Sequence, residues 1–321
     1  MSNRLDKGQQ PVAVDPRANH SEAVQVVADQ PTLISEESRE AESLLSGYWR
    51  RFRGHRLGIV GATIVGAFLL VAIFAPLLAT HDYAEANWDA LLFPPGSAGH
   101  PLGTDELGRD LYSRLVWGAR ISLEVAFVAS GISAVIGATV GALSGYYGGR
   151  VDMVISSIMD LTWSFPLILL ALVIIAVLGP GLTSVLLSFG LIVWSLYARV
   201  VRAEVLSLRN QEFVIAARAV GATSSRIILR HILPNTLGAV LVVFSVMMGQ
   251  AMLVEAALSF LGIGVRPPTP SWGAIISGGH DYIRVAPWLT AIPGAAITIV
   301  VLGFNLLGDS IRDVVDPRMK I

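Results

Sequence analysis

Residues 236–263 read TLGAVLVVFSVMMGQAMLVEAALSFLGI and contain a single charged side chain, Glu255. A helix needs about 20 consecutive, mainly apolar residues to cross a lipid bilayer. Other stretches have the same character: 57–79, 121–146, 165–178, 182–201 and 288–311. Because 165–178 is short for a span, we expect this helix to start near residue 155 and to kink at Pro166. The sequence therefore predicts an all-α integral membrane protein with six transmembrane helices.

The composition of the 321-residue chain is that of a membrane protein. Apolar residues make up 53% and charged residues 15%, against about 25% charged residues in a typical soluble domain. The net charge of −1 argues against a nucleic-acid partner. The absence of cysteine excludes disulfides and thiolate metal sites, and the six histidines include no pair at the spacing of helical metal ligands. We therefore expect no metal site.

The chain contains no nucleotide-binding loop of the form G-x-x-x-x-G-K-[ST]. Its lysines, Lys7 and Lys320, both lie outside such a sequence. In a loop of this kind the backbone and the lysine hold the phosphates of ATP. We therefore expect this chain alone to bind no ATP or other cofactor.

The distribution of charge predicts the domain organisation and the orientation. Residues 1–47 are polar and without a sustained period, which predicts a disordered tail. A basic juxtamembrane segment, 48–56, precedes the transmembrane domain, 57–321. Segment 202–235 is rich in arginine, whereas 80–110 contains six acidic residues and one arginine. Because positive charge marks cytoplasmic loops, we expect both termini and 202–235 in the cytoplasm and 80–120 outside.

Segment 211–235 reads QEFVIAARAVGATSSRIILRHILPN and predicts two short helices. One face of the first helix, at i, i+3, i+4, i+7 spacing, holds Phe213, Ala216, Ala217 and Val220. Gly221 can take the left-handed conformation that ends a helix. Thr223 or Ser224 can cap the second helix, and we expect Pro234 to close it before the next span. Small side chains on one face favour docking into a partner's groove; a helix lying on the lipid surface is the alternative.

This segment resembles the cytoplasmic EAA loop of ABC-importer permeases. The pattern of that loop is Glu-Ala-Ala, three residues, Gly, nine residues, Ile, one residue and Leu-Pro. The chain matches at both alanines, the glycine and the Leu-Pro pair, but has Ile215 for the glutamate and His231 for the isoleucine. The resemblance implies a coupling helix that sits in a cleft of a separate ATPase subunit. Its candidate contact residues are Phe213, Ala216, Ala217, Arg218, Gly221, Leu233 and Pro234.

Three further segments resemble one subfamily, the C-type subunits of dipeptide/oligopeptide ABC importers. They read HPLGTDELGRDLYSR (100–114), EAALSFLG (255–262) and NLLGD (305–309), and the likeness runs from about residue 48 to 321. It implies a type I ABC-importer permease fold in the plasma (inner) membrane of a prokaryote. The implied partners are a B-type permease subunit, two ABC ATPase subunits that bind ATP and Mg²⁺, and an extracytoplasmic substrate-binding protein. Relatives in this subfamily handle peptides, nickel or glutathione, so the cargo stays open.

Charged residues in two places are candidate functional residues. Asp105, Arg109 and Asp110 lie in the external segment and form either an internal ion-pair network or a contact with a docking binding protein. Glu255, inside a span, either pairs with a neighbouring helix or lines the translocation path. We expect no catalytic residues, because no span combines the groups that an intramembrane hydrolase needs. The alternative function, a self-sufficient secondary transporter, usually shows internal repeats, and none is evident here.

Overall fold

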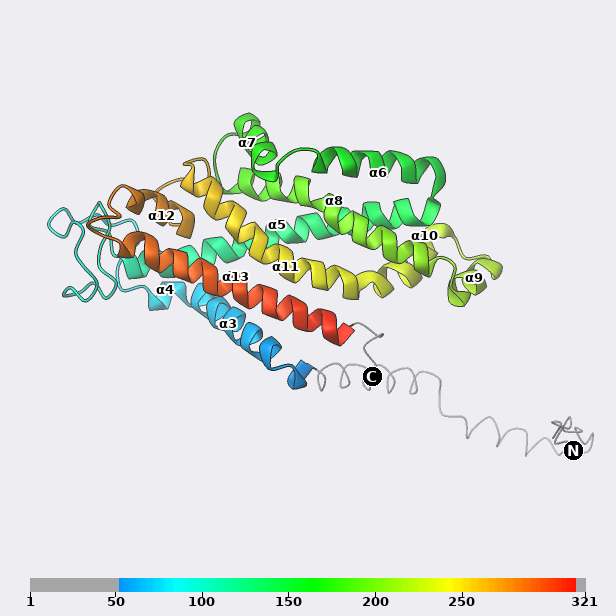
Figure 1. Cartoon of the computed structure of the whole chain (residues 1–321), viewed down its shortest axis with the longest axis horizontal. Helices are drawn as coiled ribbons and strands as arrows, with labels where there is room; N and C mark the ends of the chain where they lie inside the picture. The colour runs from blue at the N-terminus through cyan, green and yellow to red at the C-terminus, as the bar shows by residue number, and fades with distance from the viewer. Residues whose placement is uncertain (1–51, 316–321) are drawn as a thin grey trace, which may run out of the picture. The chain divides into compact units, whose positions relative to one another are not determined.

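The computed structural model describes residues 52–315 of the chain, and within this range it is helical without β-strands (Figure 1). The helices are α3 (Arg56–Ile73), α4 (Ala75–Leu78), α5 (Leu111–Tyr147), α6 (Gly149–Trp163), α7 (Leu167–Leu178), α8 (Leu182–Leu208), α9 (Glu212–Ala219), α10 (Ser224–Ile227), the π-helical turn η1 (Ile228–Ile232), α11 (Leu233–Phe260), α12 (Trp272–His280) and α13 (Trp288–Val315). The all-α prediction is confirmed. The predictions for residues 1–47 and for the start of segment 48–56 lie outside the described residues.

The described part of the chain contains six candidate membrane spans. Five are single helical runs, long and apolar enough to cross a membrane: Arg56–Ile73, Leu111–Tyr147, Leu182–Leu208, Ser224–Phe260 and Trp288–Val314. The sixth is the pair α6 and α7, which passes the same test together but is bent by 93°. With this pair counted as one broken span, the number agrees with the sequence prediction.

The third span is broken rather than kinked at Pro166. The amide of Ser164 still donates to the carbonyl of Asp160, so the helical path continues through Ser164. Phe165 precedes a proline, which disfavours the helical conformation, and Pro166 has no amide to continue the α6 ladder. Packing of α7 against α8 and α11 accounts for the rest of the turn, because Ala171 is fully buried there.

Close contact between α5 and α8 forms the centre of the bundle (Figure 1). A Cβ atom on Gly137 or Gly141 of α5 would overlap the backbone of α8, at Trp194 and at Ala198 respectively. On the other side of the bundle, α3 packs on α13, where a Cβ on Gly61 would overlap the α13 backbone. Small residues allow such close approach of helices inside a membrane. Gly61, Gly137 and Gly141 therefore serve packing, whereas a Cβ atom on Gly66 or Gly131 would meet nothing within 4 Å.

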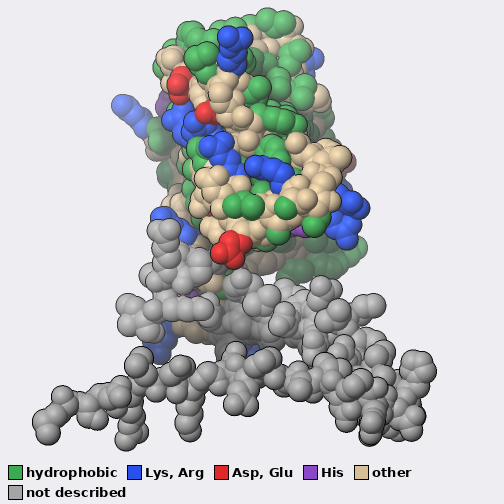
Figure 2. Space-filling view, turned by 90° about the vertical axis from the view of Figure 1, so that its right-hand side faces the viewer, with side chains coloured by type: hydrophobic (Ala, Val, Ile, Leu, Met, Phe, Trp, Pro, Cys, Tyr) green, Lys and Arg blue, Asp and Glu red, His purple; other side chains and the backbone are tan. Residues whose placement is uncertain are grey.

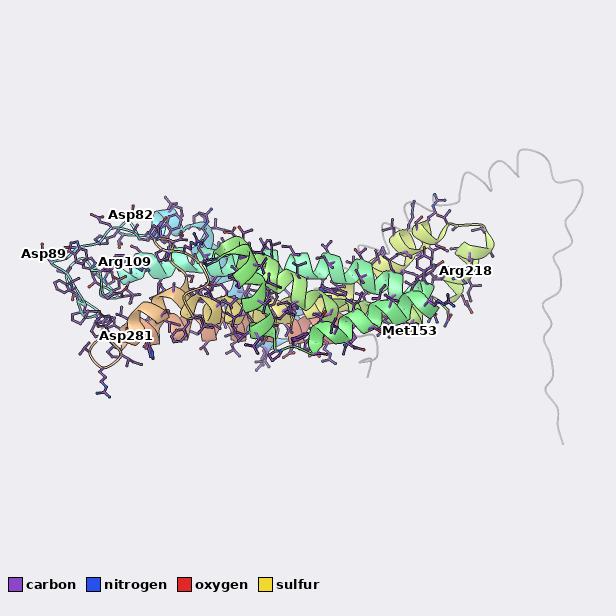
Figure 3. The ribbon with its side chains drawn as sticks, turned by 90° about the horizontal axis from the view of Figure 1, so that it is seen from above. Asp82, Asp89, Arg109, Met153, Arg218 and Asp281 are labelled. Atoms are coloured by element: carbon purple, nitrogen blue, oxygen red, sulfur yellow. The ribbon has the colours of Figure 1, made fainter. Side chains whose placement is uncertain are left out.

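The bundle has two differently built ends. We call the end that carries α9, α10 and η1 the α9 end, and the opposite end, with segment 79–110 and α12, the α12 end. Figure 3 shows Arg218 at the α9 end, while Asp82, Asp89, Arg109 and Asp281 lie together at the α12 end. The two parts of the chain singled out by the sequence, 202–235 and 80–120, are thus separated by the length of the spans.

The second helix of segment 211–235 does not end at Pro234, contrary to the prediction. The run Ser224–Phe260 is continuous through α10, η1 and α11. In η1 the amide of Leu233 donates to the carbonyl of Ile228, five residues earlier. A proline ring clashes with the carbonyl four residues before it and supplies no amide. The wider π turn accommodates Pro234 within the run and lets the helix continue.

Candidate functional site

A buried apolar cluster at the α9 end anchors α9 to the spans. Val214 of α9 is fully buried. It belongs to a cluster with Val205 of α8, Ile227 of α10 and Ile232 of η1. Because burying one such side chain contributes about 1.5–3 kcal/mol, the short helix is held in one position relative to α8 and to the run Ser224–Phe260.

Gly221 ends α9 as the sequence predicts. Its φ is +84°, in the left-handed region that glycine occupies without strain. The amide of Gly221 donates to the carbonyl of Arg218 at 3.1 Å, and the amide of Ala222 donates to the carbonyl of Ala217 at 3.0 Å. This pair of hydrogen bonds is a Schellman motif, which satisfies the last carbonyls of a helix and fixes the direction in which the chain leaves α9.

Thr223 begins the second helical limb. Its hydroxyl accepts a hydrogen bond from the amide of Arg226 at 3.4 Å, so Thr223, rather than Ser224, is the N-cap of α10. The chain therefore passes from α9 to α10 within the short stretch between the Schellman motif and this cap.

The outward face of α9 is apolar. Phe213 is 42% exposed, Ile215 54% and Val220 85%, and Ala216 is exposed as well. Ala217 is only partly exposed, because it lies at the edge of this face beside the buried cluster. Ile215, which stands at the glutamate position of the EAA pattern, is exposed on another side of the helix, about 200° around the axis from Phe213, where a carboxylate is expected from the resemblance.

The remaining predicted coupling residues lie around α9 and at the start of α11. Arg218 is exposed and holds its guanidinium 5.8 Å from the ring centre of Tyr146, a cation–π arrangement. Leu233 packs against the buried cluster, whereas Pro234 is exposed. The structure therefore brings the predicted residues to the same end of the bundle, on two limbs: Phe213, Ala216, Ala217, Arg218 and Gly221 on α9 and its cap, and Leu233 and Pro234 on α11.

Arginine side chains surround α9. Figure 2 looks onto this end and shows many basic side chains and few acidic ones. The exposed arginines of the segments that meet here are Arg150, Arg218, Arg226 and Arg230. The α9 end thus has a small exposed apolar face with basic side chains around it.

Asp105 organises the segment before α5 from inside. Its carboxylate accepts hydrogen bonds from the amides of Leu107 and Arg109, both at 2.9 Å, and from Nε of Arg109 at 2.7 Å. Nε of Arg114 lies 3.2 Å from the same carboxylate. Asp105 is 2% exposed, so the contacts of its carboxylate lie inside the loop. The geometry is that of the internal ion-pair network, the first of the two interpretations.

Asp110 joins the same segment to α5. As the N-cap of α5 it accepts from the amide of Ser113 at 2.8 Å, and it is bonded to Nδ1 of His100 at 3.0 Å and to the hydroxyl of Thr80 at 3.3 Å. Burial alone would raise the pKa of Asp110, but the hydrogen bonds from Ser113 and His100, with the nearby His81, together lower its pKa below 3.8. The folded segment therefore favours the ionised carboxylate.

His81, His100 and Asp110 form a cluster that the sequence does not reveal. The two imidazole rings stack with centroids 4.8 Å apart, and one ligand atom from each of the three residues lies within 4.8 Å of the others. Two imidazoles and a carboxylate are ligands that Zn²⁺ accepts, so this group could hold a metal ion. The three residues come from separate parts of the loop and have no common helical spacing, which is why motif analysis misses them.

Glu255 lies fully buried in α11. Its carboxylate accepts hydrogen bonds from the hydroxyl of Ser259 at 2.7 Å and from that of Ser122 at 3.4 Å. Ser122 belongs to α5, so the contact links two spans. This geometry matches the interpretation in which Glu255 pairs with a neighbouring helix.

Two ion pairs link α6 to α8, and sequence analysis missed both. Asp152 of α6 makes two hydrogen bonds with Arg202 of α8, at 2.5 and 2.7 Å. Farther along the same helices, Asp160 is paired with Arg199 at 2.9 Å. Aspartates eight residues apart in a predicted span are the signal that could have found them, because they fall on nearly the same side of a helix.

Two protein-family descriptions match the chain. The family described as "Binding-protein-dependent transport system inner membrane component" matches residues 137–321, more than half of the chain. The family described as "N-terminal TM domain of oligopeptide transport permease C" matches residues 43–95. The two matches cover the first span and the part from the last third of α5 onward.

Known relatives are similar over most of their length. The chain is 46% identical to the dipeptide transport system permease protein DppC of Alkalihalophilus pseudofirmus, over 85% of this chain and 89% of the relative. It is 38% identical to the oligopeptide transport system permease protein OppC of Bacillus subtilis, over 88% and 92%. It is 42% identical to the glutathione transport system permease protein GsiD of Escherichia coli O6:K15:H31, over 85% and 90%.

A solved structure shares the fold. An inward-facing conformation of the MetNI methionine ABC transporter superimposes with a TM-score of 0.51 at 22% identity, over 63% of this chain and 96% of the matched chain. At this identity the likeness concerns the arrangement of the helices alone, and it agrees with the predicted type I fold.

Proposed function

Because this chain belongs to the family of binding-protein-dependent transport system inner membrane components, we propose that it is the C-type permease subunit of an ATP-driven importer of short peptides. Relatives at 46% and 38% identity are permeases of dipeptide and oligopeptide transport systems. The relative at 42% identity is named for glutathione, which is itself a small peptide. The shared cargo class is a short, charged, zwitterionic chain.

In this proposal the chain forms half of a transmembrane pathway, and a B-type permease subunit forms the other half. Two ATPase subunits bind ATP and Mg²⁺ and dock at the α9 end, which faces the cytoplasm together with both termini. A substrate-binding protein delivers cargo at the α12 end, outside the plasma membrane. The arginines around α9 and the excess of acidic over basic residues in 80–110 support this orientation.

The anchored α9 with its outward apolar face is the observation that carries the coupling role. Val214 fixes the helix to the spans while Phe213 and Val220 stay exposed. Exposed apolar faces of this kind mark sites of protein contact. Eight residues give a helix only about 12 Å long, which is short for binding a lipid surface by itself. Docking into a groove of an ATPase subunit fits this geometry better.

ATP hydrolysis is then coupled to transport because ATP binds the closed and open forms of the ATPase pair with different affinities. ATP favours the closed form of the ATPase pair, and α9 follows the groove in which it sits. Because α9 is packed against α8 and the run Ser224–Phe260, its displacement biases the spans toward one of two arrangements. The sequences and the fold of the relatives favour this importer over the alternative, a secondary transporter.

The first experiment is a pull-down of the tagged chain from its native membranes in mild detergent, with mass spectrometry of what accompanies it. We expect an ATPase with a nucleotide-binding loop and a second six-span permease. Recovery of the chain alone or as a homodimer would contradict the importer and favour the secondary transporter.

Gly221→Ala tests the coupling role of α9 in the assembled complex. Its matched control is Gly66→Ala, since a Cβ atom at either glycine meets nothing within 4 Å and only Gly221 has a positive φ. We expect Gly221→Ala to cost about 1 kcal/mol at the helix end and to reduce ATP hydrolysis stimulated by the loaded binding protein several-fold. Gly66→Ala should hydrolyse ATP like the wild type. Equal stimulation in both variants would remove the coupling role.

A further inference from the structure

A line of polar side chains follows α6 from the α9 end into the membrane. Asp152, Ser156, Asp160 and Ser164 recur at every fourth residue and so lie on one side of the helix. Their large neighbours on α6 are apolar and exposed, among them Val154, Ile158 and Leu161. A helix that faced only lipid on this side would carry no such line.

Asp160 lies deep in the bilayer. It is the twelfth residue of α6, which starts at Gly149 at the α9 end, so it is about 16 Å along the helix axis. With Gly149 placed at the cytoplasmic edge of the hydrocarbon core, which is about 30 Å thick, Asp160 lies well inside the core. A long arginine side chain can reach the membrane surface from inside a span, but an aspartate cannot.

The Asp160–Arg199 pair is exposed on the surface of the chain. The side chain of Arg199 is 53% exposed and that of Asp160 is 74% exposed, although the two groups are 2.9 Å apart. By contrast, the side chains of Arg202 and Asp152, nearer the α9 end, are 31% and 19% exposed. Exposed charges at this depth face water or protein, because lipid would not solvate them.

The broken span opens beside this pair. The non-helical residues between α6 and α7 lie at membrane depth, where irregular backbone is tolerated only in contact with protein or in a water-filled cavity. A cavity of about 390 Å³ lies here, lined by residues 162–167 of the break and by Ile192 and Val193 of α8. Figure 1 shows α6 running alongside α8 and α7 turning away from the line of α6. Ile192 and Val193 are near the middle of α8, so the cavity is near the middle of the bilayer.

We propose that the α6–α7 break and the Asp160–Arg199 pair form this subunit's contact surface for peptide cargo at mid-membrane. The proposal rests on the peptide-import function given above. A short peptide carries an ammonium group at one end and a carboxylate at the other, which match Asp160 and Arg199. Trp163 and Phe165, both exposed at the break, supply apolar surface for varied peptide side chains. From there the polar line of α6 leads cargo to the α9 end.

Accessibility of the break to water provides the first test. The chain has no cysteine, so Ser164→Cys places one thiol at the break, and Leu70→Cys, on the exposed apolar side of α3, is the matched control. In the assembled complex a cationic, membrane-impermeant thiosulfonate should modify Ser164→Cys at least about tenfold faster than Leu70→Cys, read on this chain by mass spectrometry. Equal, slow modification would mean that the partner permease or lipid covers this face, and would overturn the proposal.

Uptake assays distinguish a contact between cargo and the Asp160–Arg199 pair from a purely structural role of this pair. In proteoliposomes with the whole complex, Asp160→Asn and Arg199→Gln should reduce uptake of a labelled dipeptide about tenfold. ATP hydrolysis stimulated by the loaded binding protein is recorded on the same preparations to show that each complex is assembled. The exchanged pair Asp160→Arg with Arg199→Asp keeps an ion pair but inverts its arrangement, and should stay defective in uptake.

Restored uptake in the exchanged pair, or normal uptake in both single variants, would show that the pair only ties α6 to α8 and would overturn the proposal. Failure of the wild-type complex to take up peptide would contradict the peptide-import function instead. The modification rate of Ser164→Cys would still decide whether a water-filled path runs along the break.

Discussion

Asp110 shows how one carboxylate can fix both a loop and a helix. It caps α5 through Ser113 and binds His100 from the preceding segment. We expect Asp110→Ala to lower the free energy of unfolding by about 1–2 kcal/mol, the usual effect of losing an N-cap. Asp110→Asn keeps a capping oxygen and loses only the charge, so its effect should be smaller. Thermal unfolding of the purified chain in detergent measures both, and equal effects would contradict a capping contribution of the side-chain oxygen that is independent of the charge.

Lowering the pH should remove the stabilisation that the charged carboxylate of Asp110 provides. Because the pKa of Asp110 is lowered in the folded chain, the unfolded chain binds this proton more tightly. The stabilisation is therefore complete above the ordinary pKa and is lost as the pH falls through the lower, folded pKa. The stability difference between the wild type and Asp110→Asn should shrink as the pH falls from about 5 to below about 4. A difference that grows over this pH range would contradict a lowered pKa of Asp110 in the folded chain.

Glu255 distinguishes a structural acid from one in contact with cargo. Glu255→Gln keeps an acceptor for the hydroxyls of Ser122 and Ser259, whereas Glu255→Leu leaves both buried hydroxyls without it. We expect the glutamine variant to transport peptide normally and the leucine variant to lose about 1–3 kcal/mol of stability. Uptake assays and thermal unfolding read the two effects. A transport defect in Glu255→Gln with unchanged stability would place Glu255 on the path instead.

Helix α6 is attached to the bundle mainly by polar contacts, unlike the other spans. Met159 is its one buried side chain among the described residues, and Asp152 binds Arg202 through two hydrogen bonds. A double-mutant cycle with Asp152→Asn and Arg202→Gln should give a coupling energy of about 1–3 kcal/mol, because the two groups are in direct contact. Thermal unfolding of the four proteins measures it. Additive effects would mean that the pair does not hold α6 in place.

Helix ends that depend on local chemistry could be predicted from the sequence, and those that depend on packing could not. Gly221 and Thr223 act within their own turns, so the predicted end of α9 and the predicted cap of α10 are confirmed. The effect of a proline depends on what surrounds it. Pro234 sits inside a continuous run because a π turn precedes it, while Pro166 accompanies a bend of 93°.

The orientation of the whole bundle can be tested because the chain has no cysteine. Asp89→Cys at the α12 end and Ser225→Cys at the α9 end both place a thiol at an exposed position. In intact cells a membrane-impermeant maleimide should label only Asp89→Cys, and lysis should expose Ser225→Cys. Labelling of Ser225→Cys in intact cells would reverse the proposed orientation.

The number of spans and the location of the candidate residues follow from apolar length and motif spacing, which are properties of the chain alone. Contacts between distant segments do not. The stacking of His81 on His100 and the pairing of Asp160 with Arg199 depend on how the loop and the helices pack. The sequence does place Asp105 and Arg109 close together, and the two are paired in the structure because they lie four residues apart around one turn.

The helical run Ser224–Phe260 is uninterrupted. It therefore joins α10, which follows α9, to Glu255 in one rigid rod. Its 37 residues extend for about 55 Å. A tilt of about 5° about one end of such a rod displaces the other end by about 5 Å, comparable to one helical turn. A small rotation that the ATPase imposes on one end of this rod would therefore move its other end, on the far side of the membrane, by the same angle. No loop between the two ends would have to refold.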